Sequence, residues 1–132
     1  MTDIIIAQMI AERAHSGQFR RDQKTPYIEH VNSVVEKVTS DDEKIVAYLH
    51  DVVEDSEITV DDLADVGFSP NITEAVSLLT KTKTTDYDSY IQGIKSNPLA
   101  RAVKIADMTS NLEDTPTPEQ VEKYTKGLEV LS

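Results

Sequence analysis

The sequence predicts one all-α domain, covering residues 1–132 and built from seven or eight helices. Three observations support this prediction. Apolar residues recur three and four positions apart, as they do on a helix with one buried face. Short polar stretches that carry glycine or proline separate the apolar segments. Although β-branched residues are common, no segment keeps the strict alternation of a half-buried strand.

The first half of the chain predicts three helices. The segments Ile4–His15 and Tyr27–Val38 each carry a helical stripe of apolar residues. Between them, Ser16–Pro26 is polar, basic and interrupted by breakers, which predicts a loop. Asp41 or Asp42 can cap the third helix, which we expect to run through Asp55.

Five shorter signals predict the helices of the second half. Each starts at a capping residue or a proline, or ends at a glycine or a polar break. The segments are Val60–Val66, a helix that begins at Ser69-Pro70 and reaches Leu79, Asp86–Ser96, Pro98–Leu112 and Glu119–Leu131.

Composition excludes several classes of function. The formal net charge of −11 repels the phosphate backbone of DNA and RNA, so a nucleic-acid polymer is not expected as a partner. Positive charge gathers in one place, at Arg13, Arg20, Arg21 and Lys24, which leaves room for a small anionic substrate. The chain has no cysteine, so disulfides, cysteine-ligated zinc and thiol nucleophiles are excluded.

The chain also lacks the signals of export or membrane insertion. No apolar run approaches the roughly 20 residues of a membrane span. The stretch Met1–Ile6 has no basic region ahead of its apolar residues, unlike a signal peptide. We therefore expect a cytoplasmic protein with no membrane partner.

The segment His50-Asp51-Val52-Val53-Glu54-Asp55 gathers one imidazole and three carboxylates. On a continuous helix, residues three and four apart share a face, so Glu54 and Asp55 would lie beside His50 and Asp51. A solvated acidic helix end is the simpler interpretation. Like charges at this spacing are destabilising, however, and acidic groups are unfavourable at a helix C-terminus. A bound divalent cation would relieve both effects.

His30 and Asp107 are further candidates on two other predicted helices. A lone histidine such as His30 is more often a packed or surface residue. Asp107 lies on an apolar stripe and must be paired or ligate a metal, because an unpaired buried charge is too costly. An ion pair with Lys104 or Arg101 is the alternative for Asp107. Two histidines and two aspartates would suit an octahedral ion such as Mn²⁺ or Fe²⁺.

These residues lie within longer motifs that resemble the hydrolase domain of the RelA/SpoT family, within the HD phosphohydrolase superfamily. The motifs occur in order over nearly the whole chain. They are Ala14–Arg21 (AHSGQFRR), Thr25–Val31 (TPYIEHV), Ala47–Asp55 (AYLHDVVED) and Val103–Leu112 (VKIADMTSNL). The resemblance implies a single HD-domain helical bundle of the stand-alone small alarmone hydrolase type, which releases pyrophosphate from the 3′ position of ppGpp and leaves GDP.

The resemblance also implies a role for each site residue. One divalent metal, usually Mn²⁺, would be bound by His30, His50, Asp51 and Asp107. The attacking water would be oriented and activated by Glu54 and Asp55. Phosphates would be held by Arg20 and Arg21, whose guanidinium groups match phosphate geometry. The nucleotide would also contact Asn111 and Tyr124.

The chain departs from the family pattern on the substrate side. Gln120 stands where the family generally has an arginine, Val31 replaces a proline, and the segment Leu112–Glu119 is short. Two alternatives to ppGpp hydrolysis therefore stay open. One is an HD phosphohydrolase with another substrate, for example a nucleoside monophosphate. The other is an inactive nucleotide-binding module, which the presence of Glu54 and Asp55 disfavours.

Overall fold

The computed structural model describes residues 3–132, so Met1 and Thr2 of the expected domain lie outside it. The described chain is all-α, as the sequence predicts, and its only β pairing is an isolated bridge between Phe19 and Pro26. The helices are α1 (Asp3–Ala14), α2 (Tyr27–Glu36), α3 (Asp41–Leu49), α4 (Val52–Asp55), α5 (Val60–Val66), α6 (Pro70–Leu79), α7 (Tyr87–Lys95), α8 (Pro98–Glu113) and α9 (Pro118–Leu131).

The structure divides the expected Asp41–Asp55 helix into α3 and α4, which gives nine helices in residues 3–132. The remaining helices correspond to the segments expected from the apolar periodicity. The break falls at His50 and Asp51, where the backbone tightens into a turn and Asp51 has φ −108° and ψ −1°. Periodicity does not reveal this break, because buried apolar residues continue on both of its sides.

Local sequence accounts for several helix starts. The side chains of Ser40, Thr59 and Thr117 each accept a hydrogen bond from the backbone N–H three residues later. The side chain of that later residue accepts a hydrogen bond from the backbone N–H of the capping residue. This capping box satisfies two backbone donors that a helix start leaves free. Helix α5 ends at Gly67, whose φ of 117° is accessible to glycine without strain.

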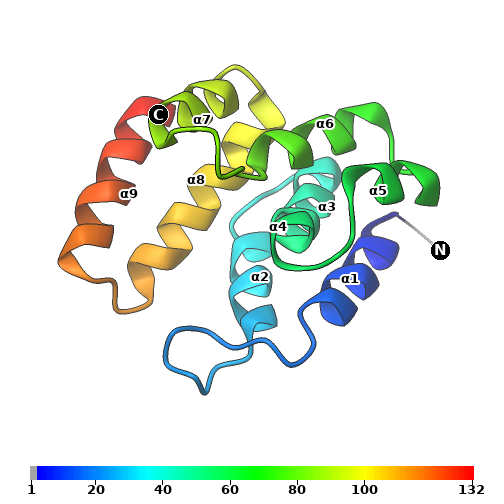
Figure 1. The fold of residues 1–132 in the computed structure, drawn as a ribbon, viewed down its shortest axis with the longest axis horizontal. Coiled ribbons are helices and arrows are strands. Elements are labelled where there is room, and N and C mark those ends of the chain that lie inside the picture. The colour runs from blue at the N-terminus through cyan, green and yellow to red at the C-terminus, as the bar shows by residue number, and fades with distance from the viewer. Residues whose placement is uncertain (1–2) are drawn as a thin grey trace.

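Helices α3 and α8 form the centre of the bundle. Helix α3 packs against α1, α2, α6 and α8, and α8 also contacts α2, α6, α7 and α9. Figure 1 shows α8 crossing the middle of the molecule, with α7 and α9 on one side of it and α1 and α2 on the other. The largest fully buried side chains are Leu49, Leu63, Ile94, Met108, Leu131, Val31, Val34, Val46, Val52, Val76 and Val103. Burial of these aliphatic groups fixes the angles between the helices that carry the site.

Close contact between α8 and α9 depends on Gly127. A Cβ atom at this position would lie 2.8 Å from Met108 Sδ and 3.4 Å from the Tyr87 hydroxyl. Glycine therefore allows α9 to approach α7 and α8 closely. In residues 3–132, no helix combines the length and the apolar character needed to cross a membrane.

Candidate metal centre and active site

The turn between α3 and α4 brings two consecutive side chains to one point. His50 Nε2 lies 2.9 Å from Asp51 Oδ2. In an uninterrupted helix, neighbouring side chains diverge by about 100° around the axis. Here the flanking residues Leu49 and Val52 are fully buried and hold the two ends of the turn in the core. The break in the helix therefore lets the His-Asp pair face the same centre.

Helices α2 and α8 complete the cluster. His30 Nε2 lies 2.8 Å from Asp107 Oδ1, and His50 Nε2 lies 3.5 Å from the same oxygen. One donor atom from each of the four residues, Asp51 included, lies within 4.8 Å of the other three. The side chains of His30, His50 and Asp107 are buried. The fold thus brings together all four residues that the sequence analysis predicted as metal ligands.

The hydrogen bonding of His50 tests whether these residues fit a metal. Its Nδ1 lies 2.6 Å from the carbonyl oxygen of Ala47, so Nδ1 carries the proton that this bond requires. The other nitrogen, Nε2, is buried and makes no hydrogen bond within residues 3–132. A ligating histidine commonly donates its second N–H to a carbonyl, which directs the free lone pair at the ion. The cluster therefore has the composition and the spacing of a divalent-metal site.

Electrostatics keep the two aspartates ionised. Burial would raise the pKa of Asp51, but the adjacent His50 imidazole outweighs burial and lowers it to about 2. Burial also opposes ionisation of Asp107, yet the Lys104 ammonium holds the pKa of that carboxyl well below its usual range. The pKa of His50 is well above its ordinary value, because Asp51 and Asp107 outweigh its burial. Without a cation, a proton on His50 would supply part of the missing positive charge.

Asp107 pairs with a cation through one carboxylate oxygen and faces the cluster through the other. Its Oδ2 accepts a hydrogen bond of 3.1 Å from Lys104 Nζ, whereas Oδ1 faces His30 and His50. The ion pair with Lys104 is therefore real, and the alternative pair with Arg101 does not form, since Arg101 donates to the backbone carbonyl of Leu131. Lys104 leaves one oxygen of Asp107 directed at the cluster.

Tyr27 is a site residue that the sequence analysis did not single out. Its hydroxyl donates a 2.5 Å hydrogen bond to Asp51 Oδ2, and its ring packs between His15 and His30, with centroids 4.9 and 5.6 Å away. His15 itself lies outside the cluster, with Nδ1 2.9 Å from Gln18 Oε1. The position of Tyr27 one turn before His30 was the available signal, because residues three apart share a helix face.

Glu54 and Asp55 differ in position. Glu54 lines the same cavity of about 240 Å³ as Asp51 and Asp107, and its Oε1 accepts a 2.6 Å bond from the backbone N–H of Lys81. Asp55 is not among the residues that line this cavity, and its backbone carbonyl accepts a bond from Gln18 Nε2. Of the two side chains expected in one pocket, Glu54 is among the residues that line this cavity, and Asp55 lies beside it on α4.

Both carboxyls are exposed, yet partial loss of solvent from the surrounding protein and nearby acids make them more basic than usual. Loss of solvent, and then the charge of Asp51, raise the pKa of Glu54 even though the Lys81 N–H favours its anion. Loss of solvent and the charges of Asp51 and Glu54 raise the pKa of Asp55 to about 6. Raised pKa values make both carboxyls better proton acceptors than ordinary carboxylates.

Five residues form the outer rim of the cavity. These are Arg20, Arg21, Asn111, Gln120 and Tyr124. All four of the substrate contacts predicted from the sequence belong to this outer rim. Gln120 is neutral and its Oε1 accepts a bond from the backbone N–H of Thr117.

The arginines of the outer rim have partners within the protein. Arg20 donates through Nε and a terminal nitrogen to Asp114 Oδ2, at 3.1 and 2.9 Å, and through that nitrogen to Asn111 Oδ1 at 3.1 Å. Arg21 donates to the carbonyl of Thr115 at 3.3 Å. Arg20, whose side chain is only 13% exposed, therefore also contributes to packing within the protein.

Comparison with known proteins identifies the family. The chain matches no family model. It is 33% identical over 123 residues to the human guanosine-3′,5′-bis(diphosphate) 3′-pyrophosphohydrolase MESH1, a match that covers 84% of this chain and 68% of the human protein. This chain belongs to the guanosine-3′,5′-bis(diphosphate) 3′-pyrophosphohydrolase family.

Other members of the pyrophosphohydrolase family give similar matches. The MESH1 enzyme of Drosophila melanogaster is 34% identical over 119 residues, which cover 78% of this chain and 66% of that protein. The pyrophosphohydrolase of Haemophilus influenzae is 36% identical over 118 residues, and the chain spans only 17% of its length. A solved structure of a metazoan SpoT orthologue that hydrolyses ppGpp superposes with a TM-score of 0.80 at 26% identity, covering 99% of this chain and 84% of that one.

Proposed function

We propose that this protein hydrolyses ppGpp, or its pentaphosphate form, and releases the 3′ pyrophosphate to leave GDP or GTP. The observation that carries the proposal is the cluster of His30, His50, Asp51 and Asp107, whose ligand atoms lie within 4.8 Å of one another. The proposal is also supported by the names of relatives that share 33–36% of their residues with this chain.

We assign the cluster to one divalent ion, with Mn²⁺ as the proposed occupant. Imidazole nitrogens and carboxylate oxygens together suit Mn²⁺ better than ions that prefer thiolates. When bound, such an ion withdraws electron density from a phosphoryl oxygen and makes water a stronger nucleophile at neutral pH. Lys104 and Tyr27 hold one carboxylate each in the orientation that the ion requires.

Glu54 and Asp55 are the proposed proton acceptors. Water attacks phosphorus at the 3′ pyrophosphate, the bond from phosphorus to the ribose 3′ oxygen breaks, and a proton reaches that oxygen. Glu54 lines the cavity and is the better placed of the two carboxylates to orient the water. Asp55 lies one position further along α4, and the charges of Asp51 and Glu54 help to raise its pKa to about 6. Such proton transfer typically contributes about 10² to 10⁴ in rate.

The outer rim is the proposed substrate-binding region. Arg20 and Arg21 carry the guanidinium groups that pair with phosphate oxygens, while Asn111 and Tyr124 offer hydrogen bonds to the nucleotide. Arg20 also connects to the cluster, because Asn111 accepts from Arg20 and donates to Asp107 at 3.4 Å. The net charge of −11 restricts such binding to a small anion rather than a nucleic-acid polymer.

The test is a panel of nucleotides incubated with Mn²⁺ and the purified protein, with the products separated by anion exchange. GDP and pyrophosphate from ppGpp support the proposal. Turnover of a nucleoside monophosphate alone supports the second candidate, which the neutral Gln120 in the outer rim favours. Binding of nucleotides without turnover of any of them would indicate an inactive binding module. The cytoplasmic location expected from the sequence belongs to the same proposal and is checked by cell fractionation.

A further inference from the structure

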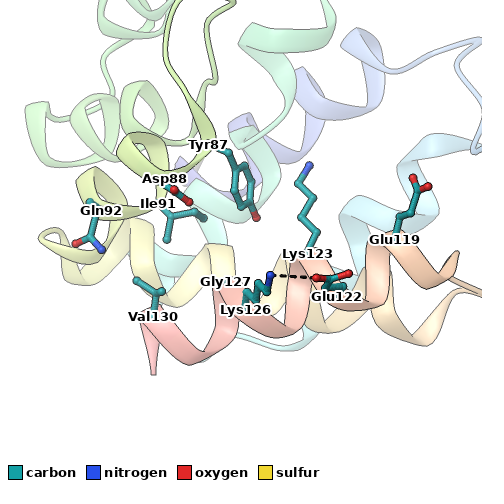
Figure 2. A pocket seen from close by; sticks show the side chains of 10 residues that line it. All are labelled: Tyr87, Asp88, Ile91, Gln92, Glu119, Glu122, Lys123, Lys126, Gly127 and Val130. Atoms are coloured by element: carbon teal, nitrogen blue, oxygen red, sulfur yellow. Dashed lines mark hydrogen bonds and ion pairs between the residues drawn. The ribbon is translucent and has the colours of Figure 1, made fainter.

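The cavity beside the metal cluster is small for the proposed substrate. It measures about 240 Å³, whereas sites for small molecules are usually roughly 300–1,000 Å³. A guanosine with two diphosphate groups must therefore extend beyond it. A groove of about 590 Å³ lies between α7 and α9, with Tyr87, Ile91, Gly127 and Val130 among its lining residues (Figure 2).

Lys123 lies where the groove meets the outer rim. Its Nζ is 4.6 Å from the centroid of the Tyr87 ring, which lines the groove, and 5.9 Å from that of Tyr124, which lines the cavity. Figure 2 shows the Lys123 side chain rising from α9 toward the Tyr87 ring. A ligand that reaches from the cluster past Tyr124 would meet this ammonium group first.

Lys123 has no anionic partner in the described part of the chain. No carboxylate oxygen of residues 3–132 lies within 4 Å of its Nζ, although Asp88, Glu119 and Glu122 also line the groove. Lys126, one turn away, forms an ion pair with Glu122 at 3.0 Å and so neutralises that carboxylate. Lys123 instead contacts the faces of two aromatic rings, an attraction that is weak for an exposed ammonium group.

The surroundings of Lys123 favour an additional anion. Partial loss of solvent, followed by the charges of Lys104 and Lys81, lowers the pKa of its ammonium group, although Asp107 and Glu54 oppose the shift. The repulsion that Lys123 experiences from these cations would decrease if a phosphate group lay beside it.

We propose that Lys123 binds the 5′-diphosphate of the substrate at the mouth of the α7–α9 groove, and that it selects nucleotides phosphorylated at both the 3′ and the 5′ positions. The inference rests on the proposed function, since it assumes that the 3′ pyrophosphate lies at the metal cluster. Gln120, one turn earlier on α9, brings no charge to this region, so Lys123 is the cation that α9 supplies there.

The experiment combines a change in the protein with a change in the substrate. Lys123→Gln, Lys123→Arg and Lys126→Gln are compared with the wild type on ppGpp and on guanosine 3′-diphosphate with a free 5′ hydroxyl. Lys126→Gln is the matched control, because it removes the same charge from the same helix at an exposed ion pair. Isothermal titration with GDP, in the presence of Mn²⁺, measures binding independently of turnover.

We expect Lys123→Gln to lower kcat/KM for ppGpp by about tenfold, as loss of a charged phosphate contact does. It should weaken GDP binding by a similar factor and leave kcat/KM for the 5′-hydroxyl substrate unchanged. Lys123→Arg should restore most of the loss, and Lys126→Gln should have little effect. Equal losses on both substrates, or an equal effect of Lys126→Gln, would overturn the assignment of Lys123 and leave the proposed function intact. Absence of wild-type turnover of ppGpp would overturn both.

Discussion

The metal cluster and the outer rim lie next to each other but are held in different ways. In the cluster, three of the four side chains are buried, and Tyr27, Lys104 and the Ala47 carbonyl fix the orientation of its groups. In the outer rim, Arg20 is bound to Asp114, an acid that a phosphate would have to replace if Arg20 binds the substrate as proposed. The first region is organised before any ligand arrives, whereas the second must exchange partners. We therefore expect substitutions in the cluster to abolish hydrolysis, and substitutions in the outer rim to change KM by moderate factors.

The largest effect is expected from His50→Ala. This change removes the buried Nε2 that faces both aspartates, so metal binding and hydrolysis should be lost together. Metal content after dialysis against Mn²⁺ measures the first, and product separation measures the second. His15→Asn is the matched control, because it removes a buried imidazole outside the cluster and should leave the metal content unchanged. Stoichiometric Mn²⁺ in His50→Ala would show that the ligands are misassigned.

A second large effect should separate proton transfer from metal binding. We expect Glu54→Gln with Asp55→Asn to lower kcat by about a hundredfold or more while Mn²⁺ and substrate still bind. The amide oxygen of the introduced glutamine can still accept the Lys81 N–H bond that Glu54 Oε1 accepts, so the local backbone should not move. Single-turnover kinetics and metal titration are the measurements. Near-normal activity would remove these residues from the mechanism, and loss of the metal would make one of them a ligand.

An intermediate effect is expected in the outer rim. Arg20→Ala together with Arg21→Ala should raise KM by about tenfold or more, because each charged contact to phosphate contributes about 1.5–3 kcal/mol. Loss of the bond between Arg20 and Asp114 should also lower the free energy of unfolding, by about 0.5–1 kcal/mol for a partly exposed pair. Lys24→Ala, in the same loop, is the control and should leave KM unchanged. A normal KM in the double variant, with a large loss of stability, would make these arginines structural.

A smaller effect, a decrease in KM, would test directly whether phosphate replaces Asp114 as the partner of Arg20. Asp114→Asn removes the anion that holds Arg20, which should then be freer to bind phosphate. We expect KM for ppGpp to fall by about two- to fivefold, within the range of a partly exposed ion pair. Steady-state kinetics at low salt measure this change. A higher KM would mean that Asp114 positions Arg20 for substrate instead of competing with it.

The smallest effect concerns the pH dependence of stability. Partial loss of solvent and the charges of Asp51 and Glu54 raise the pKa of Asp55 to about 6 from 3.8, and the exposure of this side chain keeps the effect on stability small. A carboxyl whose pKa is higher in the folded than in the unfolded state binds its proton more tightly when folded. The metal-free protein should therefore lose stability as the pH rises from about 4 to about 6, and the lost stability should not return above pH 6. Urea unfolding of wild type and Asp55→Asn should show equal stability near pH 4 and an advantage for the variant above pH 6.

The metal cluster could be predicted from the sequence more fully than the outer rim. Apolar periodicity and capping residues indicate the helices, because both depend on neighbours in sequence. The ligands of the cluster lie in motifs whose residues are few and chemically distinctive. Tyr27 needed the fold, since its role depends on a contact with Asp51, whereas the local ion pair between Lys104 and Asp107 was among the alternatives considered from the sequence. The partner of Arg20 also could not be read from the sequence, because Asp114 lies 94 residues away.

The division of one expected helix into α3 and α4 also depends on contacts between residues that are far apart in the sequence. Leu49 and Val52 continue a helical stripe, so local pattern gives no reason for a break. The turn at His50 and Asp51 is stabilised by contacts with α2 and α8, which sequence alone does not place.

The contact between His30 and Asp107 joins residues 77 positions apart, on the second and the eighth helix. An ion bound there would act as a cross-link that closes a long loop of chain, and the unfolded chain has no such arrangement of ligands. Metal supply would then set the thermal resistance of the protein as well as its activity. By mass action, an ion at 100 times its Kd adds about 2.7 kcal/mol to the free energy of unfolding. A cell short of the metal would therefore hold less of the folded protein, and not merely a less active form of it.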